Sequence, residues 1–142
     1  MKRFFTAALL LGAMTACCST QNDKPLEGTV WKLASMEGIP AEAIAADDDA
    51  FTLIFSEEDM SAAGRTNCNL YFGSYEAIDG TLAFGEMGMT RMACPDMELE
   101  TTFMHLFEQV DGFTIEGDRL ALTGDGRTLA VFVALDETAA EE

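Results

Sequence analysis

Short segments of the chain alternate apolar and polar residues, which is the pattern of β-strands that bury one face. Within residues 29–35, Trp31 and Leu33 share one face and Lys32 lies on the other. Residues 51–55 alternate in the same way, with their large apolar side chains on one face. Alternation or short apolar runs predict further strands at residues 60–63, 69–78, 81–84, 113–116, 119–123 and 128–133.

Turn residues separate these strands into hairpins. The dipeptide Asp79-Gly80 stands between two of them, and both of its positions suit the positive φ of a two-residue turn. Residues 117–118 and 124–126, which are rich in Gly and Asp, separate the last three strands in the same manner. Residues 36–50 contain glycine, proline and a run of aspartates, so we predict a loop there with a short alanine-rich helical turn.

One segment has a helical pattern instead. Pro95 suits the first turn of a helix, and apolar residues recur after it at intervals of three or four positions. Asp96, Glu98 and Glu100 place negative charge at the positive end of the helix dipole, and we expect Gly112 to end the helix. The apolar stripe consists of Leu99, Phe103, Leu106, Phe107 and Val110.

The order of these elements predicts the fold class. Strands, one helix and then more strands argue against repeated βαβ units and a parallel sheet. A lone helix has to cover one face of a curved antiparallel sheet. We therefore predict an α+β domain over residues 26–135, with a curled, barrel-like antiparallel sheet of about seven or eight strands packed on one main α-helix.

The start of the chain has the features of a bacterial export signal. Two basic residues precede an apolar stretch at 4–14, which is too short to cross a bilayer core of ~30 Å. Residues 14–17, Met-Thr-Ala-Cys, resemble the lipobox of bacterial lipoproteins, in which the signal is removed before a cysteine that is then acylated. We predict a signal peptide at 1–16, lipidation of Cys17 and a polar tether at 17–25.

Composition and charge exclude several classes of function. The chain has 142 residues, of which 49% are hydrophobic, so a single core of ordinary size can form. Its 8 Lys and Arg stand against 25 Asp and Glu, for a formal charge of −17. This charge repels nucleic acids and anionic membrane surfaces, so we expect no nucleic-acid partner and a domain that stands off from lipid. The tail at 136–142 is acidic, with nothing to bury.

Cysteine use fits an oxidising compartment. Cys17 and Cys18 lie at the predicted anchor, which leaves Cys68 and Cys94 in the folded domain. These two can close a loop of ~25 residues, for which a disulfide contributes on the order of 3 kcal/mol. The alternative is a pair of buried, reduced thiols. Neither cysteine belongs to a CxxC motif, which argues against a redox pair and a structural zinc site.

Aromatic residues occupy both faces of the predicted strand at 69–78. Tyr71 and Tyr75 share one face, and Phe72 lies on the other. A strand with bulky residues on both faces either lies in a closed core or offers aromatic side chains to a partner. We expect Phe72 in the core, and the two tyrosines are candidates for the rim of a binding groove.

Three segments of the predicted domain resemble a known family. Residues 26–33 are similar to its first strand, residues 64–69 to its Gly-Cys-Asn segment, and residues 90–94 match its Thr-x-Met-Ala-Cys motif. In this order, followed by the helix and two closing hairpins, they resemble a META domain of the HslJ heat-shock type over about residues 26–135. The motif positions are Trp31, Asn67, Cys68, Asn69, Tyr71, Tyr75, Thr90, Arg91, Met92, Ala93 and Cys94.

This resemblance implies a compact α+β envelope protein of a family in which some members are associated with stress response, drug tolerance or virulence. It brings no established catalytic reaction. Asn67 stands where the family usually has glycine, and asparagine is the next-best residue in the left-handed region, so we expect the turn to be kept. We also expect the two motifs to meet near the start of the helix, which would bring Cys68 and Cys94 together.

The residue inventory gives little support for catalysis. His105 is the only histidine, and its helical neighbours are Thr101 and Glu108, so we expect it at the surface. The sequence has no Gly-x-Ser-x-Gly motif, no P-loop and no Gly-x-Gly-x-x-Gly motif. We therefore predict no catalytic residues, no cofactor and no enzyme activity.

Sulfur-bearing residues around the second motif allow an alternative. Thioethers together with a thiolate favour Cu(I) in the envelope. Arg91 places a cation among these ligands, and methionine also fills irregular gaps in cores, so we favour the structural interpretation over a copper site. The candidate ligands are Met87, Met89, Met92, Cys94 and Met97.

Together these features predict a non-enzymatic envelope lipoprotein with a META domain that serves as a binding or stress-tolerance module. Its expected partners are the membrane, through the lipid anchor, and an unidentified component of the envelope. We expect the outer membrane as its location, and a secreted or soluble periplasmic protein is the alternative. Soft-metal binding is the alternative function.

Overall fold

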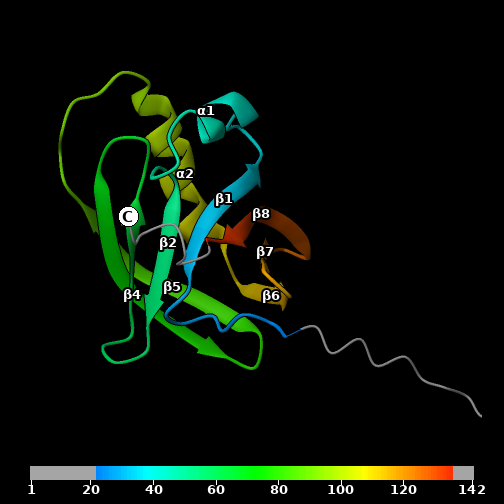
Figure 1. The fold of residues 1–142 in the computed structure, drawn as a ribbon. Helices are drawn as coiled ribbons and strands as arrows, with labels where there is room; N and C mark the ends of the chain where they lie inside the picture. The colour runs from blue at the N-terminus through cyan, green and yellow to red at the C-terminus, as the bar shows by residue number, and fades with distance from the viewer. Residues whose placement is uncertain (1–21, 136–142) are drawn as a thin grey trace, which may run out of the picture.

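Residues 22–135 are described by the computed structural model, and eight strands and two helices make up this part of the chain. In chain order they are β1 Val30–Met36, α1 Ala41–Ala45, β2 Thr52–Ser56, β3 Ser61–Arg65, β4 Leu70–Ile78, β5 Thr81–Met89, α2 Met97–Gln109, β6 Gly112–Glu116, β7 Arg119–Gly124 and β8 Arg127–Ala134. Each strand pairs antiparallel with the next, and β8 returns to pair with β1, so the sheet forms a closed barrel (Figure 1).

The predicted α+β class with a curled antiparallel sheet is confirmed. Within the described part of the chain, neither helix combines the length and the apolar character that crossing a membrane would require. The predicted signal peptide at 1–16, the lipidation site Cys17 and the acidic tail at 136–142 lie outside the described residues.

The β4–β5 hairpin turns at the predicted dipeptide. Asp79 and Gly80 have φ angles of 50° and 82°, the left-handed values that this two-residue turn requires. β5 runs to Met89, beyond its predicted end at Phe84. The sequence did not reveal the second half of this strand, because its glycines carry no side chain that could show the alternation. The pairing of β4 with β5 shifts register between Gly73 and Tyr75, which bends the long hairpin around the barrel.

The barrel has little pairing between β5 and β6. Thr81 and Gly112 are the one residue pair of the described ladder between these strands. In Figure 1, α2 stands between the β4–β5 hairpin and the last three strands. The Phe107 ring of α2 lies 4.8 Å from the Phe84 ring of β5, so the helix forms the wall of the core where strand pairing ends.

Aromatic side chains fill the interior of the barrel. Phe103 of α2 is fully buried, and its ring lies 5.3 Å from that of Phe51 and 5.7 Å from that of Tyr71, in edge-to-face contacts. Such ring pairs contribute about 0.5–1.5 kcal/mol beyond the burial of their surface. The largest buried rings are those of Trp31, Phe51, Phe55, Tyr71, Tyr75, Phe103, Phe107 and Phe132.

The expected core position of Phe72 is wrong, and the two tyrosines lie in the closed core and not at a groove rim. Tyr71 and Tyr75 are 1% and 2% exposed, whereas Phe72 is 58% exposed on the outer face. The Tyr71 hydroxyl donates to the Thr52 carbonyl oxygen, and the Tyr75 hydroxyl donates to Glu27 at 3.2 Å. Because each hydroxyl finds an acceptor, both rings can be buried without an unsatisfied polar group.

The predicted helical stripe is confirmed, but the predicted end of the helix is wrong. α2 ends at Gln109, and Val110 already has extended backbone angles. Gly112 instead begins β6, where a Cβ atom would lie 2.9 Å from the Thr123 hydroxyl oxygen. The glycine therefore permits the close approach of β6 to β7.

Replacing Phe103 with alanine should lower the free energy of unfolding by about 3–5 kcal/mol, because it leaves a cavity among the packed rings. The matched control is Phe72→Ala, which removes the same side chain from an exposed site and should cost less than about 1 kcal/mol. Equilibrium unfolding in urea measures both changes. Similar losses in the two variants would contradict the assignment of these residues to the inside and the outside of the barrel.

Candidate functional site

The two segments that resemble the META motifs meet at the start of α2. Asn69 of the first segment is 1% exposed. Its side-chain carbonyl accepts hydrogen bonds from the Thr90 hydroxyl at 3.0 Å and from the Met92 backbone N–H at 2.6 Å. Its amide group donates to the Met92 carbonyl oxygen at 3.2 Å. One asparagine side chain therefore fixes the second segment against the first.

The carboxylate of Glu100 joins this contact to α2. Glu100 lies in the first turn of the helix and is 1% exposed. Its two oxygens accept from the Asn69 amide at 3.0 and 3.1 Å, and one of them also accepts from the Asn69 backbone N–H at 3.1 Å. The Thr66 hydroxyl donates to the same oxygen. Thr66, Asn69, Thr90, Met92 and Glu100 together form the motif junction.

Neutral donors determine the ionisation of Glu100. Burial raises the pKa of this carboxyl, whereas the hydrogen bonds from Thr66 and Asn69 stabilise the ionised form and lower the pKa. The hydrogen bonds outweigh burial, so the pKa of Glu100 lies below its ordinary value of 4.5. The junction therefore contains a buried negative charge at neutral pH.

Cys68 and Cys94 form a disulfide beside the motif junction, with Cα atoms 5.9 Å apart. This confirms the bonded pair and excludes the alternative of two reduced thiols. The bond links positions 26 residues apart in the sequence, one in each motif segment. A disulfide that closes a loop of this size contributes about 3 kcal/mol, so it reinforces the contact that Asn69 makes without a covalent bond.

The expected left-handed turn at Asn67 is wrong, because Asn67 does not have a positive φ. The residue with that conformation is Asp96, with φ of 60°, directly before α2. The Asn67 amide donates to the Asp96 carbonyl oxygen at 3.1 Å. Asn67 therefore fixes the approach to the helix through a hydrogen bond that glycine could not make.

The remaining motif positions divide between the core and the surface. Trp31 is fully buried, and its indole N–H donates to the Leu26 carbonyl oxygen at 3.1 Å. Arg91 and Ala93 are exposed in the connection between β5 and α2. The motif residues thus mainly hold α2 in place and fill the core.

Cys94 cannot supply the thiolate ligand of the copper hypothesis, because it is bonded to Cys68. Of the four methionines proposed as ligands, Met87 packs against the core. Among the residues that the structure describes, no group of three or more His, Cys, Asp or Glu side chains is placed to hold a metal ion. The other three candidate ligands, Met89, Met92 and Met97, have exposed side chains.

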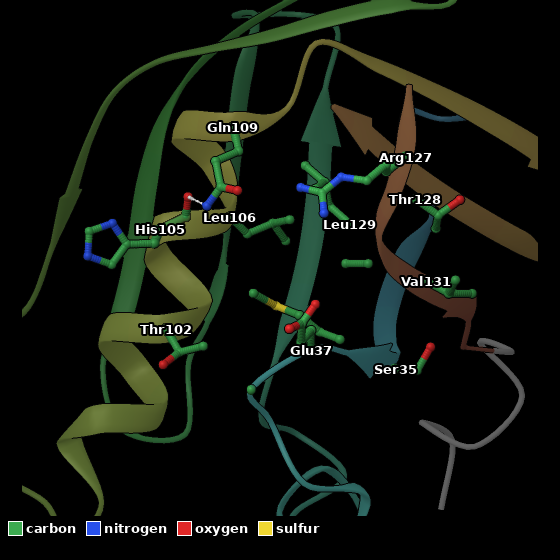
Figure 2. Close-up of a pocket in the computed structure, with 13 residues that line it drawn as sticks. Ser35, Glu37, Thr102, His105, Leu106, Gln109, Arg127, Thr128, Leu129 and Val131 are labelled. Carbon is green, nitrogen blue, oxygen red and sulfur yellow. Dashed lines mark hydrogen bonds between the residues drawn. The ribbon is translucent and has the colours of Figure 1, made fainter. Parts of the chain in front are cut away.

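A groove of about 720 Å³ lies between α2 and the pair of strands β1 and β8 (Figure 2). Arg127 extends into it from β8. Gln109 lies on the α2 side, where its amide NH₂ donates to the His105 carbonyl oxygen at 3.2 Å, and Leu106 and Leu129 supply apolar surface between the two. The β1–β8 pairing shifts register at this groove, between Leu33 and Ser35. The groove thus combines apolar contact with polar groups that converge from separate elements.

Charged groups of both signs line this groove. Arg127 forms no ion pair with another residue of the described chain, and Glu37 also lines the groove. His105 is exposed, lies 3.6 Å from Glu108, and directs its ring away from the groove (Figure 2). The single histidine is therefore at the surface, as expected, and does not face Arg127.

The outer face of the sheet is apolar over three neighbouring strands. Ile54 of β2 pairs with Ala63 of β3, and Ala63 pairs with Phe72 of β4, so these side chains form one row. Leu70 and Phe72 are more than half exposed, at 55% and 58%. A shallow groove of about 420 Å³ runs along this face.

The chain belongs to the META domain family, whose model matches residues 24–136. It is similar to a protein from Burkholderia xenovorans known from an NMR structure, with 26% identity and a TM-score of 0.61 over 96% of this chain and 100% of that chain. A DUF4847 family protein from Bacteroides vulgatus shares the fold, with 14% identity and a TM-score of 0.54 over 79% of this chain and 95% of that chain. No curated protein matches the chain.

Sequence reasoning missed the central role of Glu100, which it assigned to the helix dipole. The available signal was its position on the helix, because Glu100 precedes Phe103 and Phe107 by three and seven residues and so lies on the buried face. A carboxylate on that face requires buried donors. The polar residues of the 64–69 segment were the available candidates.

Replacing Glu100 with glutamine should lower the free energy of unfolding at neutral pH by about 1–3 kcal/mol, because the new NH₂ group faces the donors of Thr66 and Asn69. The matched control is Glu98→Gln, in the same turn but exposed, which should change stability by less than about 0.5 kcal/mol. Urea unfolding followed by Trp31 fluorescence gives both values.

The loss should also depend on pH. Because the pKa of Glu100 is lower in the folded chain than in the unfolded chain, its ionised form stabilises the fold above the ordinary value of 4.5, and this stabilisation is lost as pH falls through the folded-state pKa. The difference between the wild type and Glu100→Gln should therefore narrow as pH falls below 4.5. A difference that stays constant as pH falls from neutral to well below 4.5 would contradict this assignment.

Proposed function

We propose that this META-domain protein is a lipid-anchored protein of the bacterial envelope that binds other molecules non-covalently at its surface, supports stress tolerance and is not an enzyme. The observation that carries the proposal is the filled barrel, whose aromatic side chains pack into one continuous core. A barrel packed in this way has to bind its partners on the outside. The recognition surfaces are therefore the grooves around α2 and the outer face of the sheet.

The N-terminal sequence supports the location. An apolar stretch followed by Met-Thr-Ala-Cys at 14–17 is typical of a lipoprotein signal, and Cys17 is the residue that would be acylated. The Cys68–Cys94 disulfide fits the same location, because such bonds persist in oxidising compartments outside the cytoplasm.

The groove in Figure 2 supports a binding role. Sites for small molecules commonly combine apolar walls with a few polar groups that fix the orientation of the ligand. Leu106 and Leu129 provide the apolar walls, and Arg127 and Gln109 provide the polar groups. The guanidinium of Arg127, which forms no ion pair within residues 22–135, is suited to an anionic or carbonyl oxygen of a bound molecule.

The position of His105 supports a role without catalysis. Its side chain is 60% exposed beside Glu108, and its ring lies outside the groove. A general base has to lie within hydrogen-bond reach of the proton that it removes, and this imidazole points away from the groove. Binding alone accounts for the groups that line the groove.

A strain that lacks the gene, complemented with wild type, Cys17→Ser or Cys18→Ser, tests the proposal. Wild type and Cys18→Ser should incorporate a labelled fatty acid, fractionate with membranes and restore growth under heat and drug challenge. Cys17→Ser should do none of these at the wild-type level, because it lacks the acylation site.

Two results would contradict the proposal separately. Labelling of Cys17→Ser at the wild-type level would exclude Cys17 as the anchor. A deletion strain that grows like its parent under heat and drug challenge, with an intact envelope, would exclude the role in stress tolerance.

A further inference from the structure

β5 has an edge that no strand of the described chain covers beyond its first residues. Its ladder with β6 consists of Thr81 and Gly112, whereas its ladder with β4 continues to Met89. The connection from β5 leads into α2, which lies beside this edge but offers side chains and no strand. Within the part of the chain that the structure describes, the second half of β5 therefore pairs on one side only.

The register shows which backbone groups point to this edge. In an antiparallel pair, alternate residues direct their N–H and C=O groups toward the partner strand and the others direct them away. The Thr90 N–H donates to Leu70 on the β4 side, so the N–H groups of Met89 and Met87 point to the opposite side. At the other end of β5, the Leu82 N–H points to this same side, away from β4, and donates to the Asp111 carbonyl oxygen.

A groove of about 610 Å³ runs between this edge and α2. Met87 and Met89 of β5 line one wall, and Met104 of α2 lines the other, with the Phe84 and Phe107 rings in contact below them. Methionine side chains adapt to different apolar partners because they are flexible and polarisable. The groove thus places apolar pockets next to unpaired backbone donors and acceptors.

The charge of the groove is negative. Glu86 and Glu108 both line it and are exposed, and none of its lining residues is basic. The chain has a formal charge of −17, so the surrounding field has the same sign. Positively charged side chains of a partner would be attracted to this groove, whereas a second copy of this acidic chain would be repelled.

From these observations we propose that the edge of β5 binds an extended, basic segment of a partner protein as an added strand, held between β5 and α2. Backbone hydrogen bonds to Met87 and Met89 would give affinity, as in other cases of strand addition. Apolar side chains of the segment would enter the methionine-lined groove, and its basic side chains would meet Glu86 and Glu108. This inference rests on the proposed surface-binding function and names the class of partner.

A synthetic ten-residue peptide of alternating lysine and valine, with blocked ends, provides the probe. We expect it to bind the full chain purified from expressing cells and to slow amide hydrogen exchange at Met87 and Met89 by at least ~10-fold at saturation. The same peptide with N-methyl groups on alternate backbone amides should not slow this exchange, because it keeps the side chains but loses the donors. A peptide with glutamate in place of lysine should not bind.

Charge reversal in the protein provides the matched comparison. The double variant Glu86→Lys, Glu108→Lys should raise the Kd of the lysine–valine peptide by at least ~10-fold. The control, Glu42→Lys with Glu58→Lys, changes the net charge by the same amount at exposed positions elsewhere and should raise the Kd by less than ~3-fold.

Several results would overturn the inference. One is that the lysine–valine peptide fails to bind, or that it binds and leaves amide exchange at Met87 and Met89 unchanged. Another is that the N-methylated peptide protects these amides equally, or that the two double variants raise the Kd of the peptide equally. A dimer of the free protein in sedimentation, with these amides already protected, would assign the edge to a second copy instead. The lipidation and growth tests do not depend on this edge, so their outcome remains separate.

Discussion

The carboxylate of Glu100 connects three separate parts of the chain through neutral donors alone. It belongs to α2, it accepts hydrogen bonds from Thr66 and Asn69, and through the Asn69 side chain it reaches Thr90 and Met92. Removing one of these donors would leave the buried negative charge with fewer hydrogen bonds, which costs more than losing a surface ion pair. This interaction sets where the helix begins and how it faces the sheet.

The position of α2 determines the rest of the barrel. Because β5 and β6 share only one residue pair, the helix has to supply the wall between them, and it does so with Phe103 and Phe107. The same placement leaves the edge of β5 open on one side of the helix and a polar groove near Arg127 on the other. The motif junction therefore supports the fold directly and the two grooves beside α2 indirectly.

Local patterns in the sequence predicted the elements well, since strand alternation, the helical stripe and the turn at Asp79-Gly80 depend on neighbouring residues. They could not assign the faces of β4, because alternation shows that Tyr71 and Tyr75 share a face but not that this face is the inner one. The conformation of Asn67 and the burial of Glu100 depend on contacts about thirty residues away along the chain, between positions 67 and 96 and positions 69 and 100. Helical spacing places Glu100 on the buried face, but no local pattern identifies the distant residues that it contacts.

The central claim is that Asn69 and Glu100 stabilise the fold together. A double-mutant cycle with Asn69→Ala, Glu100→Gln and the combined variant measures this directly from the free energies of unfolding in urea. The account predicts a coupling energy of at least about 1 kcal/mol, because each residue satisfies the other inside the protein. Losses that simply add, with a coupling near zero, would contradict it.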